Sequence, residues 1–184
     1  MDAVSATRRS LRAARTMLAN HPDRPRWDRE IAHRLVDHIL SRDVTTVAAY
    51  SPLPGEPGGT ALIPALTAAG ITIWLPHSHP DGVLTWSRYA GDDQMTEGRF
   101  HIRVPTTPPV DTLTATGCEL IVVPALAVTS DGVRLGQGGG YYDRLIAANP
   151  TLPTAVVVWA EEIHDQLPVF DHDARCDAII TNDR

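Results

Sequence analysis

Hydrophobic positions along the chain repeat with two different periods, and the periods alternate from one segment to the next. Apolar residues recur at helical spacing in four segments, which predicts helices over residues 5–19, 27–40, 60–69 and 141–148. Continuous or alternating apolar runs predict β-strands over residues 44–50, 71–75, 83–89, 119–124, 154–159 and 177–181. Because helices alternate with apolar strands, we expect an α/β fold with a mostly parallel sheet.

The densest run of glycines lies between the strand predicted over 119–124 and the helix predicted over 141–148. It contains Gly136, Gly138, Gly139 and Gly140. Glycine lets backbone N–H groups approach a ligand closely, and a helix N-terminus or a nest of N–H groups favours anions. Arg134 and Arg144 flank this loop, which lacks the Lys-Ser/Thr of a Walker A motif and the dinucleotide fingerprint. The pattern predicts a phosphate cradle, and a flexible connection is the alternative.

Three arginines share one face of the helix predicted over 5–19. Arg8, Arg12 and Arg15 stand at i, i+4 and i+7. Like charges on one face repel one another unless an anion lies against them. We therefore expect a phosphate-binding face, with a solvated basic face as the alternative. The apolar stripe predicted on another face of this helix consists of Leu11, Ala14 and Leu18.

A carboxylate follows the strand predicted over residues 44–50. Two prolines and a glycine between Ser51 and Glu56 predict a stiff, turned loop. Ligands bind at the carboxyl ends of the strands in open α/β sheets. Glu56 is therefore a candidate ligand-binding residue, and a solvent-exposed loop carboxylate is the alternative.

Composition narrows the class of protein further. With 184 residues, of which 43% are hydrophobic, the chain is expected to form one domain over residues 1–184. A net charge of −6 argues against a general nucleic-acid-binding protein. The basic side chains are arginines without a single lysine, so any side-chain cation on a phosphate must be a guanidinium. Cys118 and Cys176 lack metal-site or redox spacing, which indicates a cytoplasmic protein, and no apolar run is long enough to span a membrane.

Residues 134–144 read Arg-Leu-Gly-Gln-Gly-Gly-Gly-Tyr-Tyr-Asp-Arg, and this segment closely resembles the signature of the 5-formyltetrahydrofolate cyclo-ligase family. Further similarity in the N-terminal helix, the loop around Glu56 and the C-terminal part extends the resemblance over nearly the whole chain. It implies a three-layer α/β/α fold that resembles the ribose-5-phosphate isomerase type. It also implies an ATP- and Mg²⁺-dependent enzyme that converts 5-formyltetrahydrofolate to 5,10-methenyltetrahydrofolate, ADP and phosphate.

The resemblance also assigns residues to ATP, to the metal and to catalysis. The ATP-binding set that it implies is Arg8, Arg12, Arg134, Leu135, Gly136, Gln137, Gly138, Gly139, Gly140, Tyr141 and Tyr142. The residues that it implies in catalysis are Arg12, Arg134, Tyr142 and Asp143. For Mg²⁺ it implies the carboxylates of Asp143 and Asp173. At the position of Arg8 the family usually has a lysine.

The folate substrate is assigned to a second group of residues by the same resemblance. This group consists of Ser51, Glu56, Phe100 and Tyr141. The chain departs from the family pattern at Gly58, where an Asp or Asn is common, and at Val104, where a Glu is common. We expect a cytoplasmic monomer whose partners are the two small-molecule substrates, without nucleic acid or membrane. A sensor that binds a phosphorylated ligand without catalysis and a sugar-phosphate isomerase on a similar fold are the alternatives.

Overall fold

The computed structural model describes residues 3–168 and 175–183. The α-helices are α1 (Ala3–Ala19), α2 (Arg24–Leu40), α3 (Leu62–Ala68) and α4 (Tyr141–Ala148). The central sheet contains β1 (Thr46–Ala48), β2 (Thr72–Ser78), β3 (Leu84–Arg88), β6 (Leu120–Pro124), β9 (Thr154–Val157) and β11 (Ala178–Ile180). Two small sheets contain β4 (Met95–Glu97) with β5 (Arg103–Pro105), and β7 (Ala127–Thr129) with β8 (Arg134–Leu135) and β10 (Ile163–His164). Short 3₁₀ helices are η1 (Asp92–Gln94), η2 (Arg99–His101), η3 (Leu113–Thr116) and η4 (Ala160–Glu162).

The central sheet has the strand order β11-β9-β6-β1-β2-β3. All neighbouring strands in it are parallel except the hairpin pair β2 and β3. The predicted α/β fold with a mostly parallel sheet is thereby confirmed, whereas the likeness to the ribose-5-phosphate isomerase type stays a prediction. No described helix combines the length and the apolar character needed to cross a membrane.

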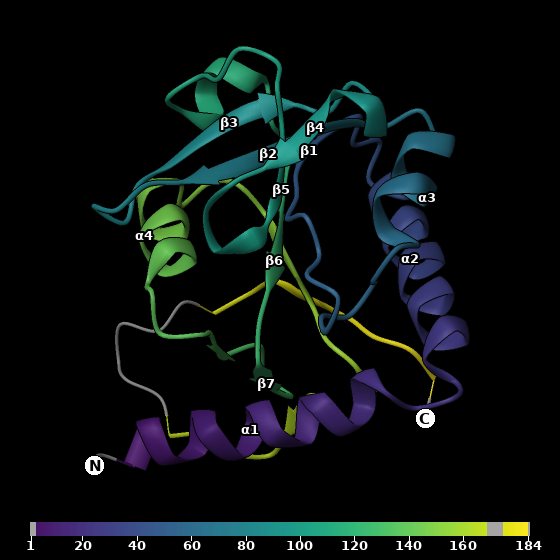
Figure 1. Cartoon of the computed structure of the whole chain (residues 1–184), viewed down its shortest axis with the longest axis vertical. Coiled ribbons are helices and arrows are strands. Elements are labelled where there is room, and N and C mark those ends of the chain that lie inside the picture. Colours follow the sequence, from purple (N-terminus) through teal and green to yellow (C-terminus); the bar gives the residue numbers. More distant parts are fainter. Residues whose placement is uncertain (1–2, 169–174, 184) are drawn as a thin grey trace.

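Helices α2 and α3 lie on one face of the sheet and α4 lies on the other (Figure 1). They cover alternate residues of the same strands. Along β6, Leu120 and Val122 pack in a core cluster with the apolar faces of α2 and α3. Ile121 and Val123 belong to a second cluster, against which the apolar residues of α4 pack. Successive side chains of a strand point to opposite faces of the sheet. Strand β6 therefore packs against helices on both faces.

The chain turns in opposite directions on the two sides of the β1–β6 pair. From β1 it passes through α3 to the neighbouring β2, whereas β6 lies on the other side of β1 and leads on to β9 and β11. Such a reversal is a topological switch point, and ligands bind there at the carboxyl ends of the strands. Tyr50 follows β1 and Pro124 ends β6, so these residues mark the expected crevice.

Helix α1 packs against the core through Leu18 of the predicted apolar stripe, and it also buries an arginine. Ala14 is exposed, whereas Arg15 is only 7% exposed. The Arg15 guanidinium donates to Glu162 Oε1 at 2.6 Å and to the Ala125 carbonyl at 2.5 Å. A buried charge is tolerated when it is paired in this way. The prediction of a shared phosphate-binding face therefore fails for Arg15, which already has a carboxylate partner inside the protein.

A small hairpin separates the central strand β6 from the glycine loop. The sequence pattern led from the strand over 119–124 straight to the loop, but β7 and β8 lie between them and pair antiparallel. Strands of three and two residues are too short for a hydrophobic period to define them. The hairpin matters for the site, because β8 carries Arg134 and Leu135 at the start of the loop.

Candidate ligand site at the switch point of the sheet

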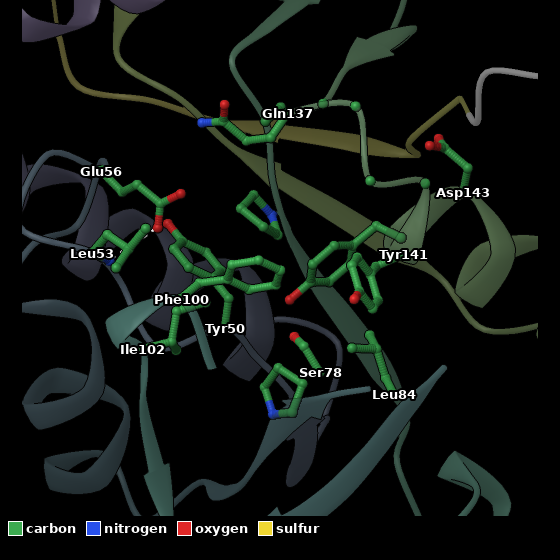
Figure 2. Close-up of a pocket in the computed structure, with 18 of the residues that line it drawn as sticks. Tyr50, Leu53, Glu56, Ser78, Leu84, Phe100, Ile102, Gln137, Tyr141 and Asp143 are labelled. Atoms are coloured by element: carbon green, nitrogen blue, oxygen red, sulfur yellow. Dashed lines mark hydrogen bonds between the residues drawn. The ribbon is translucent and has the colours of Figure 1, made fainter. Parts of the chain in front are cut away.

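A cavity of about 540 Å³ lies at the switch point, between the glycine loop and the segments that follow β1 and β6. Its lining residues are Arg8, Tyr50, Ser51, Leu53, Glu56, Pro76, Ser78, Leu84, Phe100, Ile102, Pro124, Ala125, Arg134, Gly136, Gln137, Gly138, Gly139, Gly140, Tyr141, Tyr142 and Asp143. Figure 2 shows Glu56, Tyr50 and Phe100 on one side of the cavity, and Tyr141 and Asp143 on the other. The volume is that of a site for a drug-sized ligand.

Glu56 enters the cavity from a loop whose backbone is fixed on both sides of it. Its Oε2 accepts a hydrogen bond from the Leu53 N–H at 3.0 Å, and the Tyr50 hydroxyl donates to the Pro57 carbonyl at 2.7 Å. Burial raises the pKa of the Glu56 carboxyl above its usual range, although the Leu53 N–H opposes this shift. The solvent-exposed alternative therefore does not describe this carboxylate.

The raised pKa of Glu56 predicts how the stability of the ligand-free protein varies with pH. A carboxyl whose pKa is higher in the folded than in the unfolded state adds stability below the unfolded value, about 4.3. This stability is lost as pH rises through the folded pKa. Glu56→Gln cannot ionise, so its free energy of unfolding relative to that of the wild type should rise over this pH range and level off above it. Urea titrations at several pH values measure the difference, and a difference independent of pH would contradict the prediction.

The glycine loop adopts backbone conformations that other residues rarely reach. Gly138 has φ +103°, and Gly140, which caps the N-terminus of α4, has φ +67°. Gly136 leaves no room for a side chain, because a Cβ there would lie 2.7 Å from an Arg134 guanidinium nitrogen. The loop thus combines positive φ, close packing on a guanidinium and a helix N-terminus, which suits an anion.

Arg134 and Asp143 form an ion pair at the base of the loop. The Arg134 guanidinium donates to Asp143 Oδ1 at 2.6 Å, with side-chain exposures of 3% and 26%. The same guanidinium lies 5.9 Å from the centre of the Tyr142 ring. Arg134 Nε is buried and has no hydrogen-bond partner among the residues that the structure describes. This guanidinium therefore combines a fixed position with an unsatisfied donor beside the cavity.

Two arginines of α1 approach the loop from the outside. Arg8 Nε donates to the Gly136 carbonyl at 3.0 Å. Arg12 donates to Gln137 twice, to the side-chain Oε1 at 2.9 Å and to the backbone carbonyl at 2.8 Å. A second hollow of about 340 Å³ lies here, and both arginines and Gln137 line it. Because Arg8 and Gln137 line both spaces, the hollow adjoins the main cavity.

The start of α4 is tied to the turn of the β2–β3 hairpin. The Tyr141 hydroxyl donates to the His79 carbonyl at 2.6 Å. Arg144 donates to the carbonyls of Gly82 and Gly139, at 3.2 and 2.7 Å. Arg144 thus holds the loop through hydrogen bonds to backbone carbonyls. From sequence it was interpreted only as a positive charge that flanks the loop.

The structure brings most of the predicted site residues into one cavity. Its lining includes the predicted folate residues, the loop from Gly136 to Gly140, Tyr142 and Asp143. Arg12 faces the adjoining hollow instead, and the Leu135 side chain is buried in the protein interior. Asp173 lies outside the described residues. Sequence reasoning did not single out Pro124 or Ala125, although the switch-point rule points to the end of β6.

The donor set for a metal ion rests on Asp143. The described part of the chain has no cluster of three or more His, Cys, Asp or Glu side chains that could hold a metal. Asp143 uses Oδ1 for Arg134, and a carboxylate has a second oxygen. Mg²⁺ beside a nucleotide needs only one or two carboxylates, since phosphates and waters complete its shell. The residues therefore fit a Mg²⁺ shared with a nucleotide better than an all-protein site.

Fold and cavity together define a class of protein. This is an α/β protein with a ligand cavity at the switch point of its sheet, walled by a glycine loop that opens a helix. The profile of the 5-formyltetrahydrofolate cyclo-ligase family matches residues 1–182. The chain belongs to this family, as its sequence predicted.

Individual relatives agree with this assignment. A protein of Mycolicibacterium smegmatis named 5-formyltetrahydrofolate cyclo-ligase is 34% identical over 145 residues, which cover 76% of this chain and 74% of that protein. An Escherichia coli protein of the same name is 31% identical over 140 residues, with coverages of 74% and 77%. The solved structure of a 5,10-methenyltetrahydrofolate synthetase from Mycoplasma pneumoniae superposes with a TM-score of 0.75 at 20% identity, over 100% of both chains. At this identity the solved structure shows the common fold alone.

Proposed function

We propose that this protein catalyses the ATP-dependent conversion of 5-formyltetrahydrofolate to 5,10-methenyltetrahydrofolate, with release of ADP and phosphate. The observation that carries the proposal is the cavity of this family member, in which a glycine loop with buried Arg134 faces a wall that contains Glu56 and Phe100. One wall suits phosphate, and the other suits a flat, polar ring system. The comparisons give no support to the sensor or to the sugar-phosphate isomerase.

The proposed chemistry needs no nucleophile from the enzyme. The formyl oxygen attacks the γ-phosphorus, an O–P bond forms, and the bond from the γ-phosphorus to the ADP oxygen breaks. The neighbouring amine of the folate then attacks the activated carbon and loses its proton. Phosphate leaves with the former formyl oxygen as the C–O bond breaks. The task of the protein is therefore to align two substrates and to stabilise charge that moves between phosphate oxygens.

We assign these tasks to the residues around the cavity. Arg8, Arg12 and Arg134, with the N–H groups of the loop, are proposed to hold the ATP phosphates. Tyr141 and Tyr142 lie in the cavity wall near the loop, where they could separate nucleotide from folate. The residues proposed for the folate are Ser51, Glu56, Phe100 and Tyr141.

Mg²⁺ would be held by Asp143 and the ATP phosphates, with Asp173 as a second candidate, and it would neutralise phosphate charge when bound. We further propose that the protein is a single-domain, cytoplasmic monomer that acts on small molecules, without nucleic acid or membrane as a partner. The net charge of −6 supports the exclusion of nucleic acid. Sedimentation of the purified protein with and without substrates would test the monomer.

The activity is tested by mixing the protein with 5-formyltetrahydrofolate and MgATP. We expect near-ultraviolet absorbance of the conjugated product to rise while phosphate is released in equal amount. Omission of ATP should abolish both signals. Binding of both ligands without turnover would overturn the proposal in favour of a sensor, and turnover of a sugar phosphate without ATP would favour the isomerase.

Arg12→Ala should raise the KM for ATP by about tenfold or more and leave the KM for the folate almost unchanged. A lost charge-assisted contact costs about 1.5–3 kcal/mol, and Arg12 also orders Gln137 beside the loop. Arg42→Ala is the matched control, because Arg42 is an exposed arginine that follows the far end of α2. Equal weakening of both substrates by Arg12→Ala would contradict the assignment of Arg12 to phosphate.

A further inference from the structure

A buried carboxylate lies beneath the loop that carries Glu56. Asp28, on α2, is only 6% exposed. Its Oδ1 accepts hydrogen bonds from the Gly58 N–H at 3.0 Å and from the Trp159 indole N–H at 3.3 Å. Its Oδ2 accepts from Arg24 Nε at 3.1 Å. Asp28 is thus satisfied by three donors, one of which is the backbone of the loop.

The donors around Asp28 are themselves held in place. Trp159 is fully buried, and its backbone N–H donates to Glu162 Oε2 at 3.0 Å. The guanidinium carbons of Arg15 and Arg24 lie 5.9 and 5.7 Å from the centre of the Trp159 ring. Because the indole and the two arginines are packed together, the carboxylate cannot shift without breaking several buried contacts.

The loop backbone packs directly on this carboxylate. Gly58 has φ +86° and Gly59 has φ +40°. A Cβ on Gly59 would lie 2.4 Å from Asp28 Oδ2, so a side chain at this position would collide with it. The two glycines that follow Glu56 and Pro57 therefore let the backbone turn and reach Asp28.

We propose that Asp28 is a positioning residue, which holds the loop over residues 51–59 through the Gly58 N–H so that Glu56 faces the cavity. Asp28 does not line the cavity, and it acts on the ligand through the loop. Its effect on substrate rests on the proposed function, in which Glu56 meets the folate. Its effect on the loop is a property of the protein without any ligand.

The first measurement is hydrogen exchange of the loop amides in the ligand-free protein. Asp28→Ala removes the acceptor, and the non-proline amides of residues 53–59 should exchange at least about tenfold faster, since a free energy of opening lowered by 1.4 kcal/mol gives that factor. Asparagine keeps an oxygen for the Gly58 N–H but turns its NH2 donor toward Arg24. Asp28→Asn is therefore combined with Arg24→Met, and this double variant should restore most of the protection. Ile39→Ala is the matched control, because it creates a cavity under the same helix, about 16 Å along its axis from Asp28.

The second measurement compares the two substrates. Asp28→Ala should raise the KM for 5-formyltetrahydrofolate about tenfold, as Glu56→Gln should, and leave the KM for ATP within about twofold. The Arg24→Met/Asp28→Asn double variant should have a folate KM close to that of the wild type. Ile39→Ala should lose thermal stability without this difference between substrates. A merely structural role of Asp28 would weaken both substrates together or neither.

A more stable variant is needed if Asp28→Ala does not fold. Replacing Arg24 by Met and Asp28 by Leu together exchanges the buried ion pair for apolar side chains, a change that proteins often tolerate. The same fast loop exchange and raised folate KM are expected. Loop exchange equal to that of Ile39→Ala would overturn the proposal, and so would an Arg24→Met/Asp28→Asn variant as defective as Asp28→Ala. If the wild type lacks cyclo-ligase activity, the proposed function fails, and the exchange of the loop amides alone still decides the role of Asp28.

Discussion

Gly138→Ala is expected to weaken ATP binding by about tenfold to a hundredfold. Gly138 has φ +103° in the loop between β8 and α4. An alanine is strained in this region by about 1–3 kcal/mol, and the loop can relieve the strain only by turning its N–H groups away from the phosphate position. Calorimetric titration of the variant with a non-hydrolysable ATP analogue measures the change. Affinity equal to that of the wild type would contradict the phosphate cradle.

Gly70→Ala provides the matched control for this prediction. Gly70 follows α3 and has φ +75°, and no neighbouring atom lies within 4 Å of the position that a Cβ would take. Alanine there therefore introduces backbone strain without a collision. It is expected to lower the free energy of unfolding by about 1–2 kcal/mol and to leave ATP affinity unchanged. If both variants lose ATP affinity equally, general destabilisation explains the effect, and the cradle is not needed.

Asp143→Asn should lower turnover by about a hundredfold or more. The variant keeps the shape of the side chain but removes the charge that pairs with Arg134 and would attract Mg²⁺. Because Arg134 is buried, the loss of its partner should also cost about 1.5–3 kcal/mol of stability. Turnover measured against Mg²⁺ concentration separates the two roles. Loss relieved by high Mg²⁺ indicates a metal ligand, and superimposable curves for variant and wild type contradict both roles.

A double-mutant cycle with Arg134→Met sharpens this test. If Asp143 acts only by holding Arg134, the double variant should be no slower than Arg134→Met alone. If Asp143 also holds Mg²⁺, its removal should slow the Arg134→Met variant further. The cycle therefore distinguishes a positioning carboxylate from a metal-binding one.

Local patterns were sufficient to predict the main elements of the fold. Helical spacing and apolar runs have periods that are visible within ten residues, and each predicted helix and each strand of the central sheet is present, with ends that differ by a few residues. Helix α2 begins at Arg24, before the predicted start, because Pro25 fits the first turn of a helix. The short strands β7 and β8 were missed, since their pairing depends on partners outside any local window.

The residues of the candidate site likewise fall into those that local sequence patterns predict and those that they do not. The glycine loop and Glu56 could be selected from sequence, because glycines before a helix and a carboxylate after a strand have local signatures. Arg15 and Asp28 could not be interpreted from sequence, since their partners are far along the chain. Arg15 pairs with a residue 147 positions away, and Asp28 contacts the loop 30 positions away. No spacing rule shows which arginine faces a ligand and which one faces Glu162.

The contacts of α1 determine when this helix can fold onto the protein during synthesis on the ribosome. This helix precedes every other described element, yet Arg8 bonds to Gly136, Arg12 to Gln137 and Arg15 to Glu162. Domains generally fold as units during synthesis, and contacts that are distant in sequence form late. Helix α1 can therefore make all three contacts only after the chain has been translated through Glu162. A nascent chain released before that residue would leave the Arg15 charge without its carboxylate, so a truncated product should be recognised and removed as unfolded rather than persist as a partly active enzyme.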